Sequence, residues 1–210
     1  MEVIAIIADI VRSKKIEDRK NFQLKLKNEL DKVNISSNGI ISPYTITIGD
    51  EFQAVYNNGE NILNDIINLL TIMQPVKIRF AIGFSTIETE INSQEAIGMD
   101  GPAFHVARNG INELKKNKYS LIQFYGKHFS KKPLINNGLK YSMSIMDDWK
   151  KNTLLIFNEL LKGKPIKEIV PIVKISQRGV YKIIETHNLV DLKNYFFSME
   201  DELKNLKGKE

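Results

Sequence analysis

Two aspartates far apart in the sequence, Asp9 and Asp50, are the residue pair most able to do chemistry. Asp9 ends an apolar run (residues 1–10) that predicts a buried strand. Asp50 follows Gly49 between two strand-like runs, and this Gly-Asp pair predicts a tight hairpin turn. If the hairpin lies beside the first strand, the two carboxylates meet at one edge of the sheet. Since two adjacent carboxylates repel each other, a divalent cation between them is expected.

The residues around this pair extend the predicted site. The main-chain carbonyl of Ile10 is a further expected ligand, and the ion is Mg²⁺ or Mn²⁺ holding a nucleoside triphosphate. The backbone N–H groups of Val11, Arg12 and Ser13, with the Arg12 guanidinium, are the expected phosphate donors. The alternative is structural: Asp9 ends its strand because aspartate favours turns, and Asp50 serves only the hairpin.

A second group of polar residues lies on a predicted helix over residues 102–116. His105 and Arg108 are three positions apart, so they lie side by side on one flank and can face an anionic ligand. The alternative is that each is solvated or hydrogen-bonded within the fold. Gly110 is costly inside a helix, which indicates either close packing or an early helix end.

A third group, over residues 164–186, has the pattern of a helix-turn-helix. Apolar residues mark one face of each of two short helices, and Ser176 is the expected N-cap of the second. The second helix would enter the major groove of double-stranded DNA. The residues expected to read the duplex are Ser176, Gln177, Arg178, Tyr181 and Lys182. Pro171 and Gly179 weaken the pattern, and a protein-binding helical module is the alternative.

The charge of this region favours a polyanionic partner. Between residues 150 and 182 there are eight basic and two acidic side chains. Such an excess can neutralise the phosphates of a nucleic acid.

Composition excludes several other classes. The chain of 210 residues contains no cysteine, so disulfides, thiolate-bound zinc, iron–sulfur clusters and thiol nucleophiles are excluded. No apolar run approaches the roughly 18 residues of a membrane span, so no membrane partner is expected. The first residues lack the basic segment of a signal peptide, and a cytoplasmic protein is expected.

The order of the predicted elements gives the fold class. Strand, helix, strand, strand, helix, strand is the βαββαβ pattern of an α+β, ferredoxin-like sandwich, here followed by a further helix and strand. We predict this domain over residues 1–126 and a linker over 127–140. A helical domain that contains the helix-turn-helix is predicted over 141–190, and a C-terminal helical tail over 191–210.

Four sequence blocks carry a family resemblance: IIADIV at 6–11, TIGDEFQAVY at 47–56, KIRFAIG at 77–83 and MDGPAFHVAR at 99–108. In this order they resemble the catalytic domain of class III nucleotidyl cyclases, which has a palm-type fold. The whole chain up to about residue 190 more closely resembles the SatD family, which has similar blocks followed by a C-terminal helical region.

The cyclase resemblance implies metal binding by Asp9, the Ile10 carbonyl and Asp50, and a homodimer with its sites at the interface. It does not carry over the other family residues. Ile46 stands where the family has its purine-selecting lysine. Asp100, two positions from the place of the family's selecting aspartate, is the expected nucleotide contact. His105 replaces the transition-state asparagine, and Arg108 is one position early for the transition-state arginine. Ordinary cyclase activity is therefore expected only if His105 and Arg108 have taken over these roles.

Three hypotheses follow. The leading one is a SatD-like cytoplasmic regulatory protein, in which a metal- and nucleotide-binding cyclase-like domain is coupled to a DNA-binding helix-turn-helix. The second is an active divergent nucleotidyl cyclase or NTP-cleaving phosphotransferase that depends on Mg²⁺ or Mn²⁺. The third is a protein-binding adaptor with a vestigial palm domain.

Overall fold

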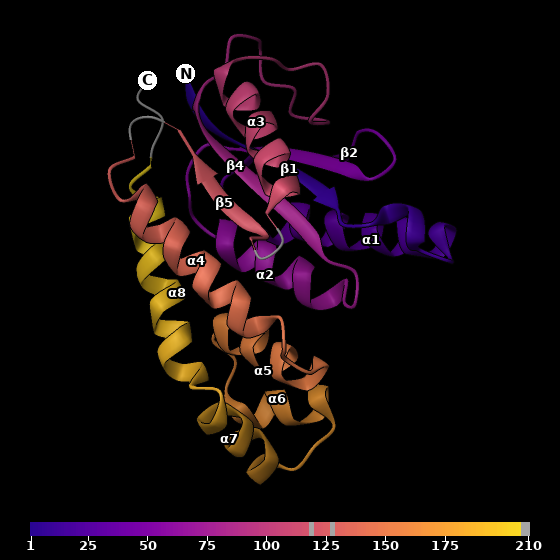
Figure 1. Ribbon diagram of the computed structural model, residues 1–210, viewed down its shortest axis with the longest axis vertical. Coiled ribbons are helices and arrows are strands. Elements are labelled where there is room, and N and C mark those ends of the chain that lie inside the picture. Colours follow the sequence, from indigo (N-terminus) through magenta and orange to yellow (C-terminus); the bar gives the residue numbers. More distant parts are fainter. Residues whose placement is uncertain (118–119, 127–128, 207–210) are drawn as a thin grey trace.

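A five-stranded sheet forms the centre of the computed structural model, which describes residues 1–117, 120–126 and 129–206. The strands are β1 (Glu2–Ile10), β2 (Ile40–Ile46), β3 (Glu51–Tyr56), β4 (Ile78–Thr86) and β5 (Ile122–Tyr125). Their order in the sheet is β2-β3-β1-β4-β5 (Figure 1). Each neighbouring pair among β2, β3, β1 and β4 is antiparallel, whereas β5 runs parallel to β4. The predicted α+β class is confirmed.

Strand β1 lies between β3 and β4 and is covered on both faces. Helices α1 (Arg19–Ser36) and α2 (Ile62–Ile72) pack on the face to which Ile4 and Ile6 point. Helix α3 (Pro102–Lys116) covers the face of Val3, Ala5 and Ile7. A strand buried on both sides needs apolar residues at almost every position, which explains the continuous apolar run at the start of the chain.

The predicted hairpin is present and lies beside β1. Gly49 takes a φ of 54°, a left-handed conformation that glycine adopts without strain, and the chain reverses there. Asp9 is directly opposite Glu51, so Asp50 lies one residue beyond the paired positions. The backbone of Asp50 stays close, because its carbonyl accepts a hydrogen bond of 3.0 Å from the Ile10 N–H.

Five helices follow the sheet: α4 (Lys132–Met146), α5 (Lys151–Leu161), α6 (Ile166–Val173), α7 (Gln177–Thr186) and α8 (Leu189–Lys204). In Figure 1, α4 and α8 lie side by side, and α6 and α7 lie at the end of the molecule farthest from α3. α4 packs on β5 and α5 packs on α2. One continuous hydrophobic core joins Phe80 of the sheet to Phe157 and Phe196 of the helices.

The predicted linker over 127–140 is wrong from residue 132 onward, because α4 begins there. Pro133 is in the first turn of that helix, where the missing N–H has no consequence, rather than in a linker. Ile135, Leu139 and Met143 follow at helical spacing and are buried. Residues 127–128 lie outside the described part of the chain.

The remaining helical predictions need smaller corrections. The helical domain predicted over 141–190 starts inside a helix, since α4 continues to Met146 and α5 begins at Lys151. The predicted tail over 191–210 is mostly α8, whose Phe196, Met199 and Leu203 are buried in the common core. Its last residues, 207–210, lie outside the described residues.

The outer side of β5 is closed by a side chain. Asn136 of α4 accepts a hydrogen bond of 2.8 Å from the Phe124 N–H and donates one of 2.8 Å to the Phe124 carbonyl. The backbone N–H and C=O groups of the residues before and after Phe124 point the other way, towards β4, because these groups alternate in direction along a strand. The amide of Asn136 therefore takes the place that one residue of a further strand would occupy.

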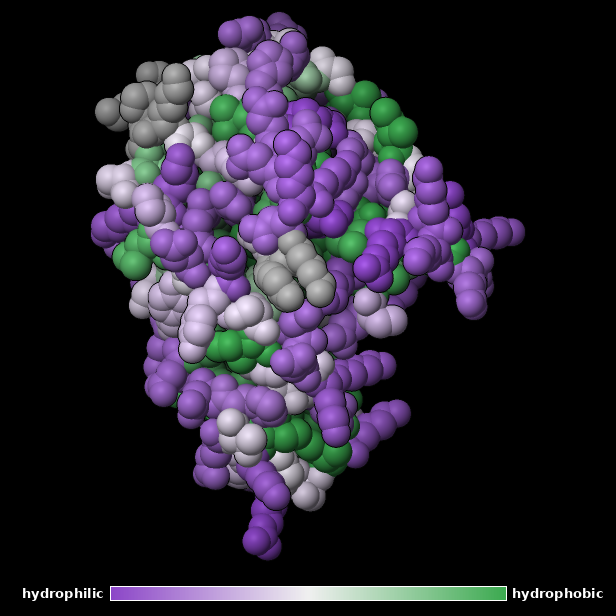
Figure 2. Space-filling view, in the orientation of Figure 1, coloured by the Kyte–Doolittle hydropathy of each residue, from purple (hydrophilic) through white to green (hydrophobic). Residues whose placement is uncertain are grey.

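The surface is mainly hydrophilic. Figure 2 shows hydrophobic residues on this face only as separate spots among hydrophilic ones. None of the helices in the described residues has the length and apolar character needed to cross a membrane.

Candidate functional sites

Asp9 is 5% exposed, and both of its carboxylate oxygens are bound by cationic side chains. Arg79, directly opposite on β4, donates from Nη1 to Oδ2 at 2.9 Å. Lys115, in the last turn of α3, approaches Oδ1 at 2.9 Å. A carboxylate in this position is stabilised by the protein's own positive charges.

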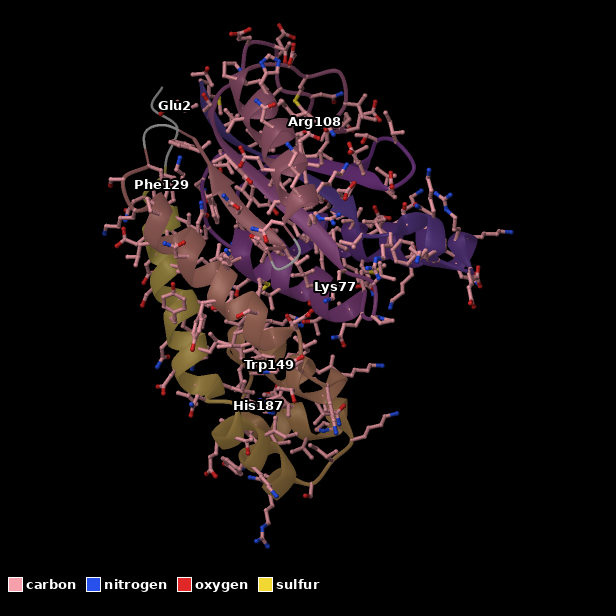
Figure 3. All side chains as sticks on the ribbon, in the orientation of Figure 1. Glu2, Lys77, Arg108, Phe129, Trp149 and His187 are labelled. Carbon is pink, nitrogen blue, oxygen red and sulfur yellow. The ribbon has the colours of Figure 1, made fainter. Side chains whose placement is uncertain are left out.

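Glu51 completes this arrangement from the other side. It is paired with Arg108 of α3 and lies 3.6 Å from the Lys115 Nζ. Three cations (Arg79, Arg108, Lys115) thus surround two acids (Asp9, Glu51), and we call these five residues the β1–α3 charge cluster. Arg108 is labelled on α3 in Figure 3.

Asp50 makes a different contact from Asp9. Its Oδ2 accepts a hydrogen bond of 2.6 Å from the Ser13 hydroxyl, which lies just after β1. The structure therefore brings the two backbones together, as predicted, but engages the two carboxylates with separate partners.

This arrangement does not fit a Mg²⁺ or Mn²⁺ ion at Asp9, Ile10 and Asp50. An ion there would have to displace Arg79 and Lys115 from Asp9, and cations at that distance repel another cation. Among the described residues, no group of three or more histidine, aspartate or glutamate side chains is placed to hold a metal. Metal binding stays a prediction, and no chemical step is derived through it.

The predicted phosphate donors are only partly free. The Val11 N–H already donates to the Lys77 carbonyl at 2.9 Å, so its predicted role as a phosphate donor is not supported by this geometry. Ser13 is predicted to use its backbone N–H; its hydroxyl, which is a different group, donates to Asp50. Arg12 is exposed in a left-handed conformation (φ 56°), and within the described chain its guanidinium has no hydrogen-bond or ion-pair partner.

His105 and Arg108 do not form a shared anion site. His105 Nε2 lies 2.9 Å from Asp100 Oδ1, both side chains being exposed, whereas Arg108 binds Glu51. Asp100, the other predicted nucleotide contact, is thus paired with His105. Gly110 is explained by close packing, because a Cβ at this position would overlap the ring of Tyr125 on β5.

The predicted DNA-binding residues lie together on α7. Ser176 caps the helix, its Oγ accepting a hydrogen bond of 3.1 Å from the Gly179 N–H. Val180 and Ile184 are buried, and the outward side chains are all exposed: Ser176, Gln177, Arg178, Tyr181 and Lys182. α6 persists through Pro171 and ends at Val173. The C-cap residue Lys174, with a φ of 54°, then turns the chain sharply into α7.

Contacts behind α7 fix it to the rest of the molecule. α5 packs against both α6 and α7. The ring of Trp149 lies 5.7 Å from that of His187, which directly follows α7, and 5.5 Å from Phe157 of α5 (Figure 3). The exposed face of α7 is therefore supported by a packed apolar layer.

The basic side chains of this region fall into two groups. Lys162 and Lys164 are bound by the Glu159 carboxylate, at 2.9 and 2.5 Å. Burial alone raises the pKa of Glu159, but Lys164 and Lys162 bring it below its ordinary value. The other six basic side chains of residues 150–182 are exposed and have no acidic partner within the described chain: Lys150, Lys151, Lys167, Lys174, Arg178 and Lys182.

Sequence reasoning missed Arg79, Lys115 and Glu51. Arg79 had a signal, since a charged residue in an apolar strand needs a partner when it is buried. That partner was not identifiable, because only the register of β1 against β4 puts Arg79 opposite Asp9. Lys115 resembles any basic residue at a helix C-terminus.

Comparison with known proteins gives a family. The SatD family model matches residues 3–188 of the chain. The solved structures that resemble it include a bacterial light-regulated adenylyl cyclase, at 14% identity, with 59% of this chain and 74% of that chain covered. The TM-score of 0.37 is too low to carry an argument about fold or activity. No curated protein matches. From the family match, which spans most of its length, the chain belongs to the SatD family.

Proposed function

We propose that this chain is a regulatory protein that binds double-stranded DNA through α6 and α7, arranged as a helix-turn-helix. The observation that supports this most is the two-sided character of α7. Val180 and Ile184 fix one face to the core, whereas Gln177, Arg178 and Lys182 are exposed on the other.

The dimensions and chemistry of α7 suit the major groove. Ten residues make a helix of about 15 Å, and the groove is wide enough to accept one helix. The Arg178 guanidinium can make two hydrogen bonds to a guanine, and the Gln177 amide can make two to an adenine. Lys167, Lys174 and Lys182 would bind phosphates on either side of the groove.

The α+β part is the proposed regulatory domain. The antiparallel order β2-β3-β1-β4, with α1 and α2 on one face, supports a ferredoxin-like arrangement extended by α3 and β5. Helix α2 of this part packs on α5, and α5 packs in turn on α6 and α7. A ligand that moves α2 can thereby influence DNA binding. Nucleotide binding, a homodimer and a cytoplasmic location remain predictions.

Duplex binding by the full chain tests the proposal. We expect saturable anisotropy changes with a labelled duplex, and affinity that falls steeply with salt because counterions are released. The double variant Arg178→Ala/Lys182→Ala should reduce the salt slope by about 1, for the phosphate contact of Lys182, and should lower the preference for one duplex sequence over another, because Arg178 no longer reads a base. A matched control, Lys20→Ala/Lys27→Ala, removes two exposed lysines of α1 and should leave the slope unchanged.

Two results would contradict the proposal. Binding that ignores salt, or that is equal in both double variants, removes DNA as the partner of α7. If NTPs incubated with Mn²⁺ give cyclic or cleaved products that Asp50→Ala abolishes, the catalytic hypothesis takes its place.

A further inference from the structure

A cavity of about 740 Å³ lies where α1, α2 and α5 meet, between the α+β part and the helical part of the molecule. Most of the residues that line it are polar. The lining includes Ser37, Asn64, Asp65, Asn68, Asn158 and Lys162. A polar cavity of this volume suits a small hydrophilic ligand, since ligand sites span about 300–1,000 Å³.

Asp65 supplies one buried carboxylate to this cavity, and the residue is only 8% exposed. Its Oδ2 accepts hydrogen bonds from the Ser37 hydroxyl and, at 2.9 Å, from the Tyr56 hydroxyl. Its Oδ1 accepts none from the part of the chain that the structure describes, and no cationic side chain there pairs with it. Burial raises the pKa of Asp65 to about 6, as expected for a carboxylate without a counter-charge.

The lysines of the lining do not neutralise Asp65. Lys162 is held by Glu159 at 2.9 Å, and Lys32 is held by Glu29 at 2.7 Å. The lining therefore has one uncompensated negative charge when Asp65 is ionised.

Three asparagines add unused hydrogen-bonding groups. Asn158 donates from Nδ2 to Asn68 Oδ1 at 3.0 Å, which joins α5 to α2. Asn64 donates from Nδ2 to Glu200 Oε2 at 3.0 Å, which joins α2 to α8. Each amide uses one polar atom in this way, and its other polar atom has no partner among the described residues. These cross-links fix the wall before any ligand arrives.

We infer that this cavity binds a small hydrophilic molecule of the amino-sugar class, with its protonated amino group against Asp65 and its hydroxyl groups on the asparagines. A buried carboxylate without a counter-charge selects a cation, and fixed amides select groups that both donate and accept hydrogen bonds. The inference does not depend on DNA binding. Because the ligand would touch both α2 and α5, its binding would act on the element that carries α6 and α7.

Glucosamine, titrated into the ¹⁵N-labelled full chain, tests this site, with glucose as the uncharged counterpart. At a pH of about 7 Asp65 is mostly ionised, because its pKa is about 6, and the amino group of glucosamine is still mostly protonated. We expect saturable shifts of the side-chain amide signals of Asn64, Asn68 and Asn158. Glucose should bind about tenfold more weakly or worse, because it lacks the charge-assisted hydrogen bond.

Two variants separate the site from general effects. Asp65→Asn should weaken glucosamine binding by about tenfold or more and bring it to the level of glucose. Should that variant fail to fold, Asn68→Ala, which removes one wall amide, is expected to weaken both sugars. Asn112→Ala, at an exposed position on α3 across the sheet, is the control. Absent shifts, equal binding of the two sugars, or binding indifferent to Asp65→Asn would each overturn the inference.

Discussion

At the residue scale, Asp9 is the carboxylate that the sequence motif predicts, but its partners are cationic side chains of the protein. Arg79 and Lys115 supply the positive charge that a bound metal would otherwise supply. A buried carboxylate with two such partners is costly to disturb, because the loss of one partner leaves charge uncompensated.

Lys115→Ala should increase the affinity for Mn²⁺ by about tenfold or more, since it frees Asp9 Oδ1 and removes a positive charge beside Glu51. We expect this variant to fold, because Lys115 is partly exposed and Arg79 still binds Asp9. Electron paramagnetic resonance of free Mn²⁺ measures the difference. If the unmodified chain binds Mn²⁺ more tightly than the variant, and Asp50→Ala abolishes that binding, the metal site predicted from the sequence is present instead.

Glu200 gives a pH-dependent prediction. The residue is 6% exposed, and burial raises the pKa of its carboxyl from 4.5 to about 7. The folded pKa exceeds the unfolded one, so the associated stability is complete below about pH 4.5 and is lost as pH rises through about 7. Glu200→Gln stays uncharged throughout. We therefore expect this variant to gain up to about 3 kcal/mol over the unmodified chain between pH 4.5 and pH 8.

Urea unfolding at the two pH values measures this gain. Glu17→Gln, at an exposed position, is the control and should show no such pH-dependent difference. If Glu200→Gln changes the free energy of unfolding equally at both pH values, burial does not raise the pKa of Glu200 and the prediction is wrong.

The sequence predicted the positions of Asp9 and Asp50 in the fold better than it predicted their contacts. Asp9 and Asp50 were placed on neighbouring strands because apolar periodicity and turn chemistry are local signals. The partners of these acids depend on strand register, and a shift of one residue places Glu51 rather than Asp50 opposite Asp9.

At the scale of elements, α3 is held against β5 by the absence of a side chain at Gly110. A methyl group there would overlap Tyr125, whose hydroxyl also donates to the Gly110 carbonyl at 3.2 Å. Alanine normally stabilises a helix relative to glycine. Whether Gly110→Ala raises or lowers the free energy of unfolding therefore shows how closely α3 packs on Tyr125.

Gly110→Ala should destabilise the chain by about 1–3 kcal/mol, because α3 or the ring must move. In a Tyr125→Ala background the same change should instead stabilise it, by up to about 1 kcal/mol, since only helix propensity remains. Thermal unfolding of the four chains of this double-mutant cycle gives both values. Additive effects of the two substitutions would show that helix and ring do not meet.

Helix boundaries were predictable where capping residues mark them. Ser176 was expected to cap α7, and it does so. The linker prediction failed because Pro133 is compatible both with a loop and with a first helical turn, and only burial of the residues after it decides between these.

At the scale of the whole molecule, the two predicted domains share one core. Besides the apolar contacts, Lys77 before β4, labelled in Figure 3, is ion-paired with Asp147 after α4. Large apolar side chains of α2 and β5 are covered only when α4 and α5 are in place. Local sequence signals do not reveal such an interface, because it joins segments far apart in the chain.

A fragment of residues 1–126 should therefore fail to fold stably, although it contains the entire sheet. We expect poorly dispersed NMR signals and no cooperative thermal transition for this fragment, whereas the full chain unfolds in one transition. A dispersed spectrum with a sharp transition would contradict this and favour two independent domains.

Asn136 has a consequence for behaviour at high concentration. Open strand edges recruit strands from other molecules, and proteins that persist at high concentration block them. On one border of this sheet, β2 is irregular and contains Pro43; on the other, a single amide satisfies the backbone of Phe124. Asn136→Ala would expose that backbone to intermolecular recruitment, and light scattering should then show concentration-dependent clustering that Asn137→Ala, at the neighbouring position, does not cause.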